Sequence, residues 1–527
     1  MQTLLPFFLA LVTAIVLLNM LASKLKIAYP ILLVIGGLFI GFIPGLPVIH
    51  IKPDLIFLVF LPPLLFFSAG AASFKEMRKW WRMIGSFAFL VVFITALAVA
   101  VVANHFIPGF SIGLGFLLGG IVSPPDAVST AAITKFVKIP KVLTSVLEGE
   151  SLVNDASSLI IFRFALIAVG TGQFIWQDAT FSFLWMVLGG TGIGLLLGWF
   201  FVQMHKLLPT DAPTDTVFLL MEPYAMYWIA EHLQSSGVLA VVAGGLYISK
   251  KWLVFLSSSS RLRVVNVWES FIFLLNGIVF FIIGLALPDI VKGLRTEGIS
   301  LSSAIGYGVL ITIVLIVIRI ICCYVAQAST LIFNRKALPA EIPWRAYLVP
   351  LIMGWTGMRG VVSLAAALSI PVMYNGIVFP QRNLILLITF VVIFLTLVIQ
   401  GLTLPLFINK SKVFEHLVLI NSHEDEQERK IKSGLRKEVY TFLKHRYDDG
   451  HLQNSVLFQK MMQHWEENEK ADDDEWMNEE TRQVYIESLD AQRKYLSELN
   501  KQEDIDEGLI RRQLYLLDLQ EERMKLG

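Results

Sequence analysis

Long apolar stretches recur along most of this chain of 527 residues, and they constrain its fold more than any other feature. Most approach the roughly 20 residues that an α-helix needs to cross the hydrocarbon core of a bilayer, while the ninth is short and can continue into the residues around Trp252. The stretches cover residues 3–22, 28–47, 54–72, 83–104, 112–134, 143–169, 179–204, 216–232, 237–249, 266–287, 303–330, 345–372 and 382–408. The first has no basic segment before it and no obvious cleavage site, so we expect a retained span rather than a signal peptide. The sequence therefore predicts an all-α polytopic membrane protein with 13 transmembrane helices.

Charged residues divide the chain into two parts near Lys410. Over the whole chain only 16% of residues are charged, whereas soluble proteins carry roughly 25%. Residues 1–409 hold 24 Lys and Arg with 15 Asp and Glu, while residues 410–527 hold 19 and 27. We therefore expect a transmembrane domain over 1–409 and a water-soluble tail over 410–527. This composition excludes an ordinary soluble enzyme.

Basic residues in the connecting loops predict the orientation of the helices. If the N-terminus lies outside the cell, the cytoplasmic loops hold 17 Lys and Arg and the outer loops hold four. Cytoplasmic loops are normally the richer in these residues. The count predicts a multi-pass protein of the cell membrane with its N-terminus outside and its C-terminus in the cytoplasm.

Charged residues also fall within or near the predicted spans. The arginines are Arg163, Arg319 and Arg359, and the acidic residues are Asp126, Glu148, Glu150, Asp155, Glu222, Glu231 and Glu269. A charge at membrane depth is costly, so it needs an ion-pair partner or a water-filled cavity. A helix–helix salt bridge can explain any one of them, but so large a set favours a transport pathway. For Arg163 we expect a partner in Glu222 or Glu269.

Two predicted spans contain residues that interrupt a helix. In the fifth, Pro124 and Pro125 directly precede Asp126, and prolines remove backbone donors and clash with the preceding turn. In the twelfth, glycines surround Arg359 in the segment GWTGMRGVV. Interrupted helices at matching places in two halves of a chain are typical of secondary transporters with inverted repeats. We expect spans four to six and eleven to thirteen to be such repeats. The two broken helices would cross at mid-membrane, where Asp126 and Arg359 offset the partial charges of the helix ends.

The sixth span has a polar face that can bind a small cation. Glu150, Asn154 and Ser158 recur every four residues on one helical face, with Ser151 and Asp155 beside them. Carboxylate, amide and hydroxyl groups all offer oxygen atoms as ligands. A buried carboxylate can hold a proton or, after losing it, a cation, so Asp155 can alternate between H⁺ and a metal ion. For Asn154 the alternative explanation is an interhelical hydrogen bond.

Glycines spaced four residues apart occur at Gly37–Gly41 and at Gly190–Gly194–Gly198. Such spacings allow two helices to approach closely. The contacts they make are expected either at a dimer interface or within one chain.

An ordered set of motifs resembles the sodium/proton exchanger family, the cation/proton antiporter-1 group of bacterial and animal proteins. The motifs are SPPDAVS, GESLVNDAS, AEHLQSSGVLAVVAGGL, an arginine in the eleventh span, GMRGVVS and TLVIQGLTLP. They follow one another at family-like spacing over essentially all of residues 1–409. The resemblance implies a bacterial-type homodimer with inverted repeats. It also implies that a core domain (83–169 and 303–408) slides like an elevator against a dimerisation domain (3–72 and 179–287).

The resemblance further implies an ion-binding site. Asp155 would carry the Na⁺ or the H⁺, with Asn154 beside it, and Ser151 would help to bind the cation. Asp126 would lie near the site. Many relatives have Thr or Val before this fifth-span aspartate, whereas this chain has Pro125, so only a backbone carbonyl can serve as a ligand at that position.

Other residues are implied in supporting roles. Arg319 would form a structural ion pair with Glu150. Pro124 and Arg359, together with the second proline, would support the broken helices. Glu231 corresponds to a position associated with inhibitor access in animal members.

These observations predict a secondary antiporter that exchanges Na⁺, or Li⁺, for H⁺ and contributes to pH homeostasis. Exchange of K⁺ by the same fold is the main alternative. An intramembrane enzyme is disfavoured because HExxH, GxSxG and GxGD-type motifs are missing from the sequence. A channel is disfavoured because no repeat resembles a carbonyl selectivity filter.

The sequence also bears on the energy source and the stoichiometry. No P-loop, cofactor motif or nucleic-acid-binding charge pattern is found, so we expect ion gradients to drive transport without nucleotide, nucleic acid or cofactor. Relatives that move net charge carry two adjacent aspartates where this chain has Asn154–Asp155. The single carboxylate therefore predicts electroneutral 1:1 exchange.

The tail is predicted to form a small helical cytosolic domain. Residues 429–446 are basic with apolar residues at helical spacing and can lie along an anionic membrane surface, while residues 466–480 are acidic and read as an exposed loop. Apolar residues then fall on one helical face at Tyr485, Leu489, Leu496 and Leu499, and the pattern continues less regularly at Leu509, Leu514, Leu516 and Leu517. Whether the tail regulates transport or only adds solubility stays open at this point.

Overall fold

The computed structural model describes residues 4–25, 27–43, 53–126, 139–172, 176–333, 347–374, 377–411, 413, 421–448, 479–502 and 505–526. The chain divides into two compact units. Unit 1 comprises residues 1–208, 218–251 and 267–416, and unit 2 comprises residues 209–217, 252–266 and 417–527.

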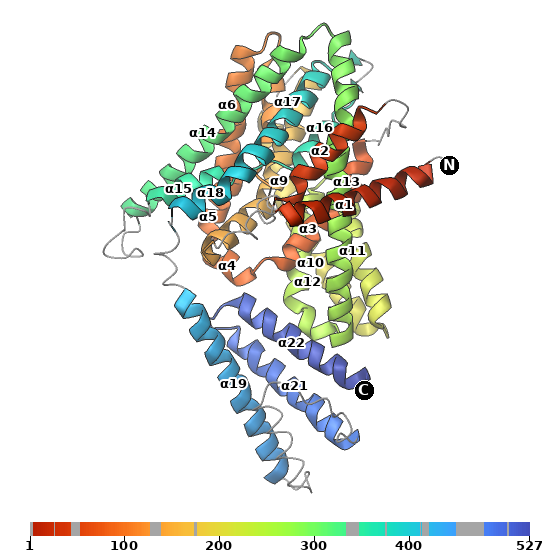
Figure 1. Ribbon diagram of the computed structural model, residues 1–527, viewed down its shortest axis with the longest axis vertical. Helices are drawn as coiled ribbons and strands as arrows, with labels where there is room; N and C mark the ends of the chain where they lie inside the picture. Colours follow the sequence, from red (N-terminus) through yellow and green to blue (C-terminus); the bar gives the residue numbers. More distant parts are fainter. Residues whose placement is uncertain are drawn as a thin grey trace. The chain divides into compact units, whose positions relative to one another are not determined.

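Unit 1 contains the apolar helices, which follow the predicted spans (Figure 1). In chain order they are α1 (Leu4–Leu25), α2 (Tyr29–Gly41), α3 (Pro53–Ala71), α4 (Phe74–Lys79), α5 (Trp81–Gly85), the π-helix η1 (Ser86–Val91), α6 (Val92–Phe106), α7 (Ile112–Val122), α9 (Lys141–Thr171), α10 (Trp176–Leu207), α11 (Ala212–His232), α12 (Gly237–Phe255), α13 (Ser258–Thr296), α14 (Leu301–Phe333), α15 (Val349–Trp355), α16 (Val361–Leu368), α17 (Arg382–Leu395), the π-helix η4 (Thr396–Gln400) and α18 (Gly401–Ser411). The start of α11 and the junction of α12 with α13 belong to unit 2.

The helix lengths agree with a polytopic membrane protein. Within the described residues, eight helical segments are long and apolar enough to cross a membrane, and three shorter apolar helices add to them. The short ninth predicted span continues past residue 249, as expected, because α12 runs through Trp252 to Phe255. The all-α polytopic class is therefore established, while the count of 13 spans and the inverted repeats stay predictions.

One short element departs from the all-α prediction. After α16, strand β1 (Met373–Tyr374) pairs antiparallel with strand β2 (Ile377–Val378). The sequence between them is Asn-Gly, the dipeptide that most favours a two-residue hairpin turn. This local signal was available in the sequence.

The glycine spacings serve packing within the chain. A Cβ on Gly194 would collide with the backbone of Ala240 on α12, Gly198 faces Gly244 of the same helix, and Gly190 meets Ser236 directly before it. Gly37 on α2 meets the backbone of Phe281 on α13 in the same way. Of the two explanations offered by the sequence, intrachain contact is the one observed for these glycines.

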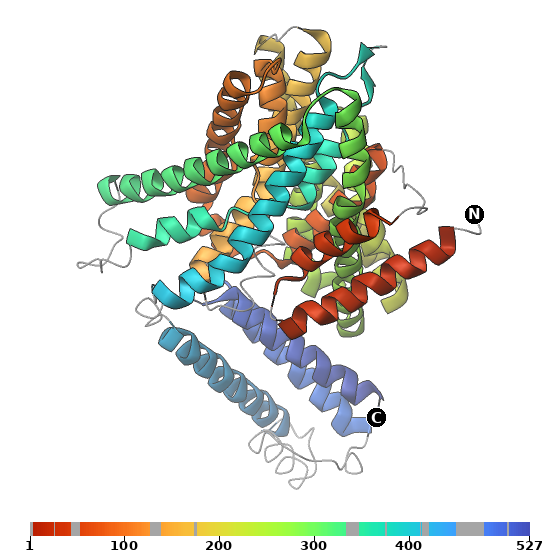
Figure 2. The ribbon, with the colours of Figure 1, turned by 45° about the horizontal axis from the view of Figure 1, so that its top comes forward.

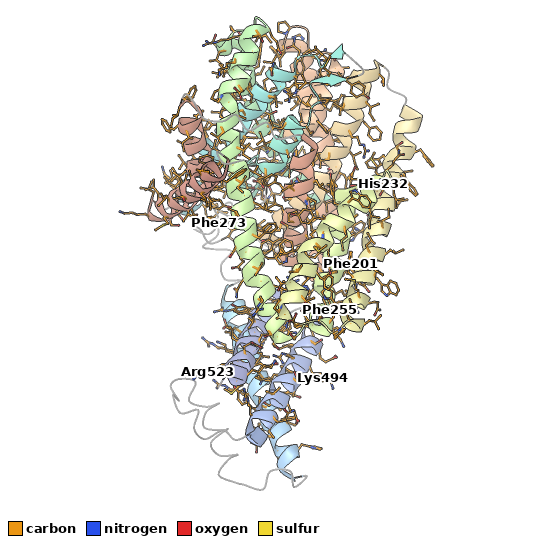
Figure 3. The ribbon with its side chains drawn as sticks, turned by 90° about the vertical axis from the view of Figure 1, so that its right-hand side faces the viewer. Phe201, His232, Phe255, Phe273, Lys494 and Arg523 are labelled. Atoms are coloured by element: carbon orange, nitrogen blue, oxygen red, sulfur yellow. The ribbon has the colours of Figure 1, made fainter. Side chains whose placement is uncertain are left out.

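Unit 2 is built around the tail helices α19 (Asn421–Asp448), α21 (Glu479–Leu499) and α22 (Glu507–Leu526). The three lie side by side in both Figure 1 and Figure 2. Figure 3 shows charged residues of this unit, Lys494 on α21 and Arg523 on α22, both exposed to solvent. The apolar faces share one core, made of Ile431, Leu435, Val439, Leu443, Val484, Tyr485, Leu489, Leu496, Ile505, Leu509, Ile510, Leu514 and Leu517.

The tail helices follow the predicted apolar pattern except at Leu516. Leu516 is exposed rather than buried, because the buried positions of α22 recur every three or four residues and Leu516 falls between them. Most of the predicted acidic loop, residues 466–478, lies outside the described residues.

Candidate ion-binding site

Both predicted helix interruptions occur in unit 1. Helix α7 ends at Val122, and the buried Pro124 and Pro125 follow it. Helices α15 and α16 are separated by the segment from Thr356 to Gly360. Residues 127–138, the second half of the predicted fifth span, lie outside the described residues.

The two interruptions meet each other. The backbone N–H of Asp126 donates to the carbonyl of Met358 at 2.7 Å. A Cβ on Gly360 would collide with the Asp126 carboxylate, so glycine allows this carboxylate to lie against the backbone at the start of α16. Because the N-terminal end of a helix has a partial positive charge, Asp126 lies where a negative charge is favoured.

Arg359 has the complementary position at the end of α7. Its side chain is almost fully buried, with Nε donating to the Val122 carbonyl at 2.7 Å and Nη2 to the Ser123 carbonyl at 3.1 Å. The last carbonyls of a helix lack intrahelical donors and have a partial negative charge. Arg359 therefore neutralises the C-terminal end of one broken helix, while Asp126 faces the N-terminal end of the other.

Helix α9 places its polar face beside the first interruption. Asn154 is fully buried, and its Nδ2 donates to the Pro125 carbonyl at 3.4 Å. Its Oδ1 has no hydrogen-bond partner within the described part of the chain. Asp155 and Ser151 are each 8% exposed. The hydrogen bond that the sequence offered as the alternative explanation of Asn154 is thus present, and within the described residues its amide oxygen accepts no hydrogen bond.

Arg319 of α14 and Glu150 of α9 form a two-pronged ion pair. The distances are 2.6 Å from Nη1 to Oε1 and 2.9 Å from Nη2 to Oε2, and both side chains are buried. A Cβ on Gly357, in the interruption between α15 and α16, would collide with the Arg319 side chain. The glycine-rich interruption therefore also provides space for this arginine.

The prediction that Arg163 pairs with Glu222 or Glu269 is wrong. Its Nη1 lies 3.5 Å from Oε2 of Glu231 on α11, and Oε1 of Glu231 accepts from the Gly237 N–H at the start of α12. Of the two candidates from the sequence, Glu222 instead contacts His205 at 2.8 Å, and the other is exposed on α13. The choice depended on which helix packs beside α9, which hydropathy and spacing do not encode.

Sequence reasoning missed one supporting group. The Thr396 hydroxyl, at the start of η4, accepts from the Arg359 backbone N–H at 3.2 Å. This threonine opens the TLVIQGLTLP motif, which carries part of the family resemblance but by itself indicates no role for the hydroxyl. Within the described residues, no group of three or more His, Cys, Asp and Glu side chains is arranged to hold a metal ion.

A buried carboxylate beside two interrupted helices, with opposite charges at their facing ends, is the architecture of a secondary ion transporter. Comparison with known proteins identifies the particular group. Residues 8–410 match the family described as sodium/hydrogen exchanger, transmembrane. The chain belongs to this family, the cation/proton antiporter-1 group.

Individual relatives agree with this assignment. The chain is 29% identical over 489 residues to the sodium, potassium, lithium and rubidium/H⁺ antiporter of Bacillus pumilus, covering 91% of this chain and 72% of that protein. It is 32% identical over 390 residues to the Na⁺/H⁺ antiporter ApNhaP of Aphanothece halophytica, covering 73% and 70%. Its fold is similar to the sodium proton antiporter MjNhaP1 of Methanocaldococcus jannaschii, with a TM-score of 0.60, 19% identity and coverage of 76% and 98%.

Proposed function

We propose that this protein exchanges Na⁺, and also Li⁺, for H⁺ across the cell membrane, one for one, by elevator-type alternating access. The observation that carries the proposal is the position of Asp155. It is buried on α9 next to Asn154, which is hydrogen-bonded to the helix interruption at Pro125. The carboxylate thus lies beside the part of the fold where backbone groups are freed from helical hydrogen bonds.

Asp155 is the proposed carrier of both ions. When ionised it binds the cation, together with Oδ1 of Asn154, which accepts no hydrogen bond from the described residues, and the hydroxyl of Ser151. When protonated, Asp155 is neutral, and the core domain returns to the other side of the membrane without a cation. Because both ions use the same carboxylate, they compete, and each binding event excludes the other.

The other charges of the site stay in place during this cycle. Asp126 faces the N-terminal end of α16, and Arg359 is bound to the carbonyls that end α7. Removing either charge would leave a helix end uncompensated at membrane depth. We therefore count one exchangeable charge per cycle, that of Asp155, and the cycle is electroneutral.

Na⁺ is the first candidate cation because the matched family is that of sodium/hydrogen exchangers. Potassium is the second candidate, supported by the Bacillus relatives whose names include potassium and rubidium as well as sodium and lithium. A homodimer with its N-terminus outside and C-terminus in the cytoplasm is part of the same proposal, and rests on the loop charges and the resemblance.

Purified protein in liposomes is expected to show saturable, Na⁺-driven proton movement whose final pH gradient does not depend on membrane voltage. Each uncompensated charge per cycle would contribute about 2.3 kcal/mol per 100 mV, so a 1:1 cycle and an electrogenic one are easily distinguished. The measurement compares the final pH gradient at membrane voltages of 0 and about −100 mV, a difference at which one uncompensated charge would contribute about 2.3 kcal/mol. Valinomycin with K⁺ sets the voltage, or a thiocyanate gradient does so if K⁺ is itself exchanged.

Each ion is tested separately, with N-methylglucamine as the inert control. Exchange with K⁺ but not Na⁺ would replace the proposed ion by its alternative. A voltage-dependent final pH gradient contradicts 1:1 stoichiometry, and flux that does not saturate contradicts antiport.

The ion pair between Arg163 and Glu231 allows a test of the elevator mechanism. It joins the ion-carrying helix α9 to α11, and α11 belongs to the proposed dimerisation domain, so sliding must break it. We expect Arg163→Gln to raise the exchange rate by about 1.5- to 5-fold, because exposed ion pairs contribute ~0.2–1 kcal/mol. Both side chains are more than a third exposed, which places the pair in that range.

A double-mutant cycle isolates the pair. Glu231→Gln keeps an oxygen that can accept from the Gly237 N–H, so it removes only the charge. The double variant should behave like either single variant, and Arg295→Gln, at an exposed arginine of α13, should leave the rate unchanged. Additive effects of the two single changes would show that the residues act independently.

A further inference from the structure

Basic and aromatic residues follow one another along the short segment that connects α3 to η1 (Figure 1). It contains α4 and α5 and reads FKEMRKWWRM over residues 74–83. Arg78, Lys79 and Arg82 are exposed, and so is Trp81, at 63%. Tryptophan and basic side chains are enriched where a membrane protein meets the headgroups of the bilayer. We therefore expect this segment at the membrane–water interface.

One side of the segment is fixed to the rest of unit 1. The Ser73 hydroxyl accepts from the Glu76 N–H at 3.2 Å and caps α4. The Glu76 carboxylate in turn accepts from the indole N–H of Trp80 at 3.0 Å. Trp80 and Met83 pack against a buried apolar cluster to which α9 and α15 contribute. The exposed side chains of the segment are therefore carried by an ordered backbone.

Basic side chains of the segment contact aromatic rings. The guanidinium carbon of Arg82 is 5.6 Å from the centroid of the Trp81 ring, and Nζ of Lys79 is 5.7 Å from that of Trp80. A cation–π contact orients a charged group without cancelling its charge. Within the part of the chain that the structure describes, Arg78, Lys79 and Arg82 form no ion pair. Their charges are therefore available to bind an anion.

A second helix brings a further cation to this surface. Lys250, near the end of α12, is exposed, and its Nζ is 4.7 Å from the centroid of the Phe74 ring at the start of α4. The neighbouring Ser249 donates to the Gly70 carbonyl at the end of α3, at 3.0 Å. Phe74 and Arg78 are four residues apart, so they lie on one face of α4. Lys250 thus lies on the face of α4 that carries Arg78.

We propose that this surface binds the phosphate group of an anionic phospholipid. We call it the basic-aromatic patch, and it consists of Phe74, Arg78, Lys79, Trp81, Arg82 and Lys250. Arginine and lysine donate charge-assisted hydrogen bonds to phosphate oxygens, and basic pockets between membrane helices bind lipid headgroups on the cytoplasmic side. The proposed orientation of the chain places the basic-aromatic patch at the cytoplasmic leaflet. Its two aromatic rings supply apolar contact with the acyl chains.

Charge decides which class of lipid the basic-aromatic patch binds. Four cations are set against one acidic residue of the segment, Glu76, whose carboxylate already accepts from Trp80. A zwitterionic headgroup has an ammonium group of its own, which these cations repel. An anionic headgroup has no such group, so it is the preferred ligand.

The first test measures lipid affinity of the full-length protein in a neutral detergent, as lipid adducts in native mass spectra. Phosphatidylglycerol should bind more tightly than phosphatidylcholine with the same acyl chains. Arg78→Gln with Arg82→Gln should raise the Kd for phosphatidylglycerol about 10- to 25-fold, because each basic residue near an anionic headgroup contributes a factor of about five. Lys250→Gln alone should raise it about fivefold, which tests the second helix separately.

The matched control is Lys292→Gln with Arg295→Gln, which removes two exposed cations from α13 and should leave the Kd unchanged. Size-exclusion chromatography verifies that each variant is folded. An unchanged Kd in both the double variant and Lys250→Gln would overturn the proposal. Equal affinity for the two lipids would do the same. Displacement of phosphatidylglycerol by equimolar inorganic phosphate would mean that the ligand is free phosphate rather than a lipid.

The second test locates the lipid in a bilayer. Liposomes contain equal amounts of phosphatidylglycerol and phosphatidylcholine, and one of the two has bromine atoms near the headgroup end of its chains. The fluorescence of Trp81, obtained as the difference between the wild type and Trp81→Phe, should be quenched more by brominated phosphatidylglycerol. This preference should disappear in Arg78→Gln with Arg82→Gln. Equal quenching by the two brominated lipids in the wild type would contradict a lipid site at the basic-aromatic patch.

Discussion

Asp155→Asn is expected to reduce Na⁺-driven proton movement to the level of protein-free liposomes while leaving the protein folded. The amide has nearly the shape of the carboxylate, but it can neither release a proton nor neutralise a bound cation. Asp155 is buried beside the interruption at Pro125, and in the proposed cycle it is the one carboxylate that changes state. The measurement is pH-dependent dye fluorescence in liposomes, with size-exclusion chromatography to verify folding.

Two further variants sharpen this result. Asp155→Glu keeps a titratable group on a longer side chain and should retain slow exchange. Asp289→Asn makes the same chemical change at an exposed carboxylate on α13 and should be indistinguishable from the wild type. Substantial Na⁺-dependent proton movement by Asp155→Asn would remove this residue from the mechanism.

The wild-type protein should also show competition between the two ions. If one carboxylate binds either Na⁺ or H⁺, the Na⁺ concentration for half-maximal rate should rise by up to about tenfold for each unit that the pH falls below the pKa of that site. A half-saturation value that does not change with pH would mean that the ions bind at separate groups.

Arg319→Ala is expected to destabilise the folded transporter by on the order of 3–5 kcal/mol, because it leaves the Glu150 carboxylate buried without its partner. The pair is two-pronged, with distances of 2.6 and 2.9 Å, and joins α14 to α9. Poor expression and a lowered midpoint of thermal unfolding in detergent are the expected readouts. Glu150→Leu alone should be similarly destabilising, since it isolates the arginine.

Replacing both Arg319 and Glu150 tests whether the two residues stabilise the fold as a pair. Arg319→Met with Glu150→Leu removes both charges and should be more stable than either single variant. Arg295→Ala, at an exposed arginine, is the control and should unfold like the wild type. A double variant no more stable than the single ones would mean that the two residues do not stabilise the fold as a pair.

Much of this protein follows from its sequence because bilayer burial leaves a strong pattern. Long apolar stretches with few charges predicted the helices, and the change in charge near Lys410 predicted a separate tail. The interruptions were also predictable, since Pro124 and Pro125 remove backbone donors wherever they occur. The polar face of α9 followed from helical spacing alone, which places Asn154 one turn after Glu150.

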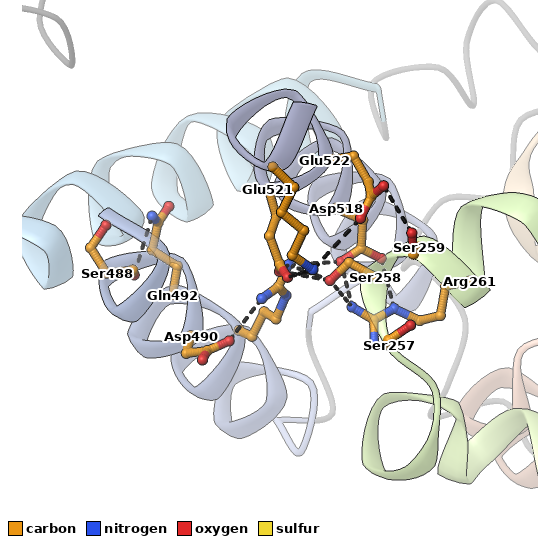
Figure 4. Close-up of polar contacts among 12 residues, drawn as sticks. Ser257, Ser258, Ser259, Arg261, Ser488, Asp490, Gln492, Asp518, Glu521 and Glu522 are labelled. Carbon is orange, nitrogen blue, oxygen red and sulfur yellow. Dashed lines mark hydrogen bonds and ion pairs between the residues drawn. The ribbon is translucent and has the colours of Figure 1, made fainter. Parts of the chain in front are cut away.

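Tertiary structure decided which groups meet. Arg163 pairs with Glu231 because α11 lies within reach of α9, and long side chains allow several partners that hydropathy cannot rank. Arg359 was expected to offset a helix end, but only the fold assigned it to the carbonyls that end α7. Arg261 pairs with Asp518 across more than 250 positions of sequence (Figure 4). Helical periodicity acts over a few residues, whereas contacts of this kind depend on how whole elements pack, so they are decided by the tertiary structure.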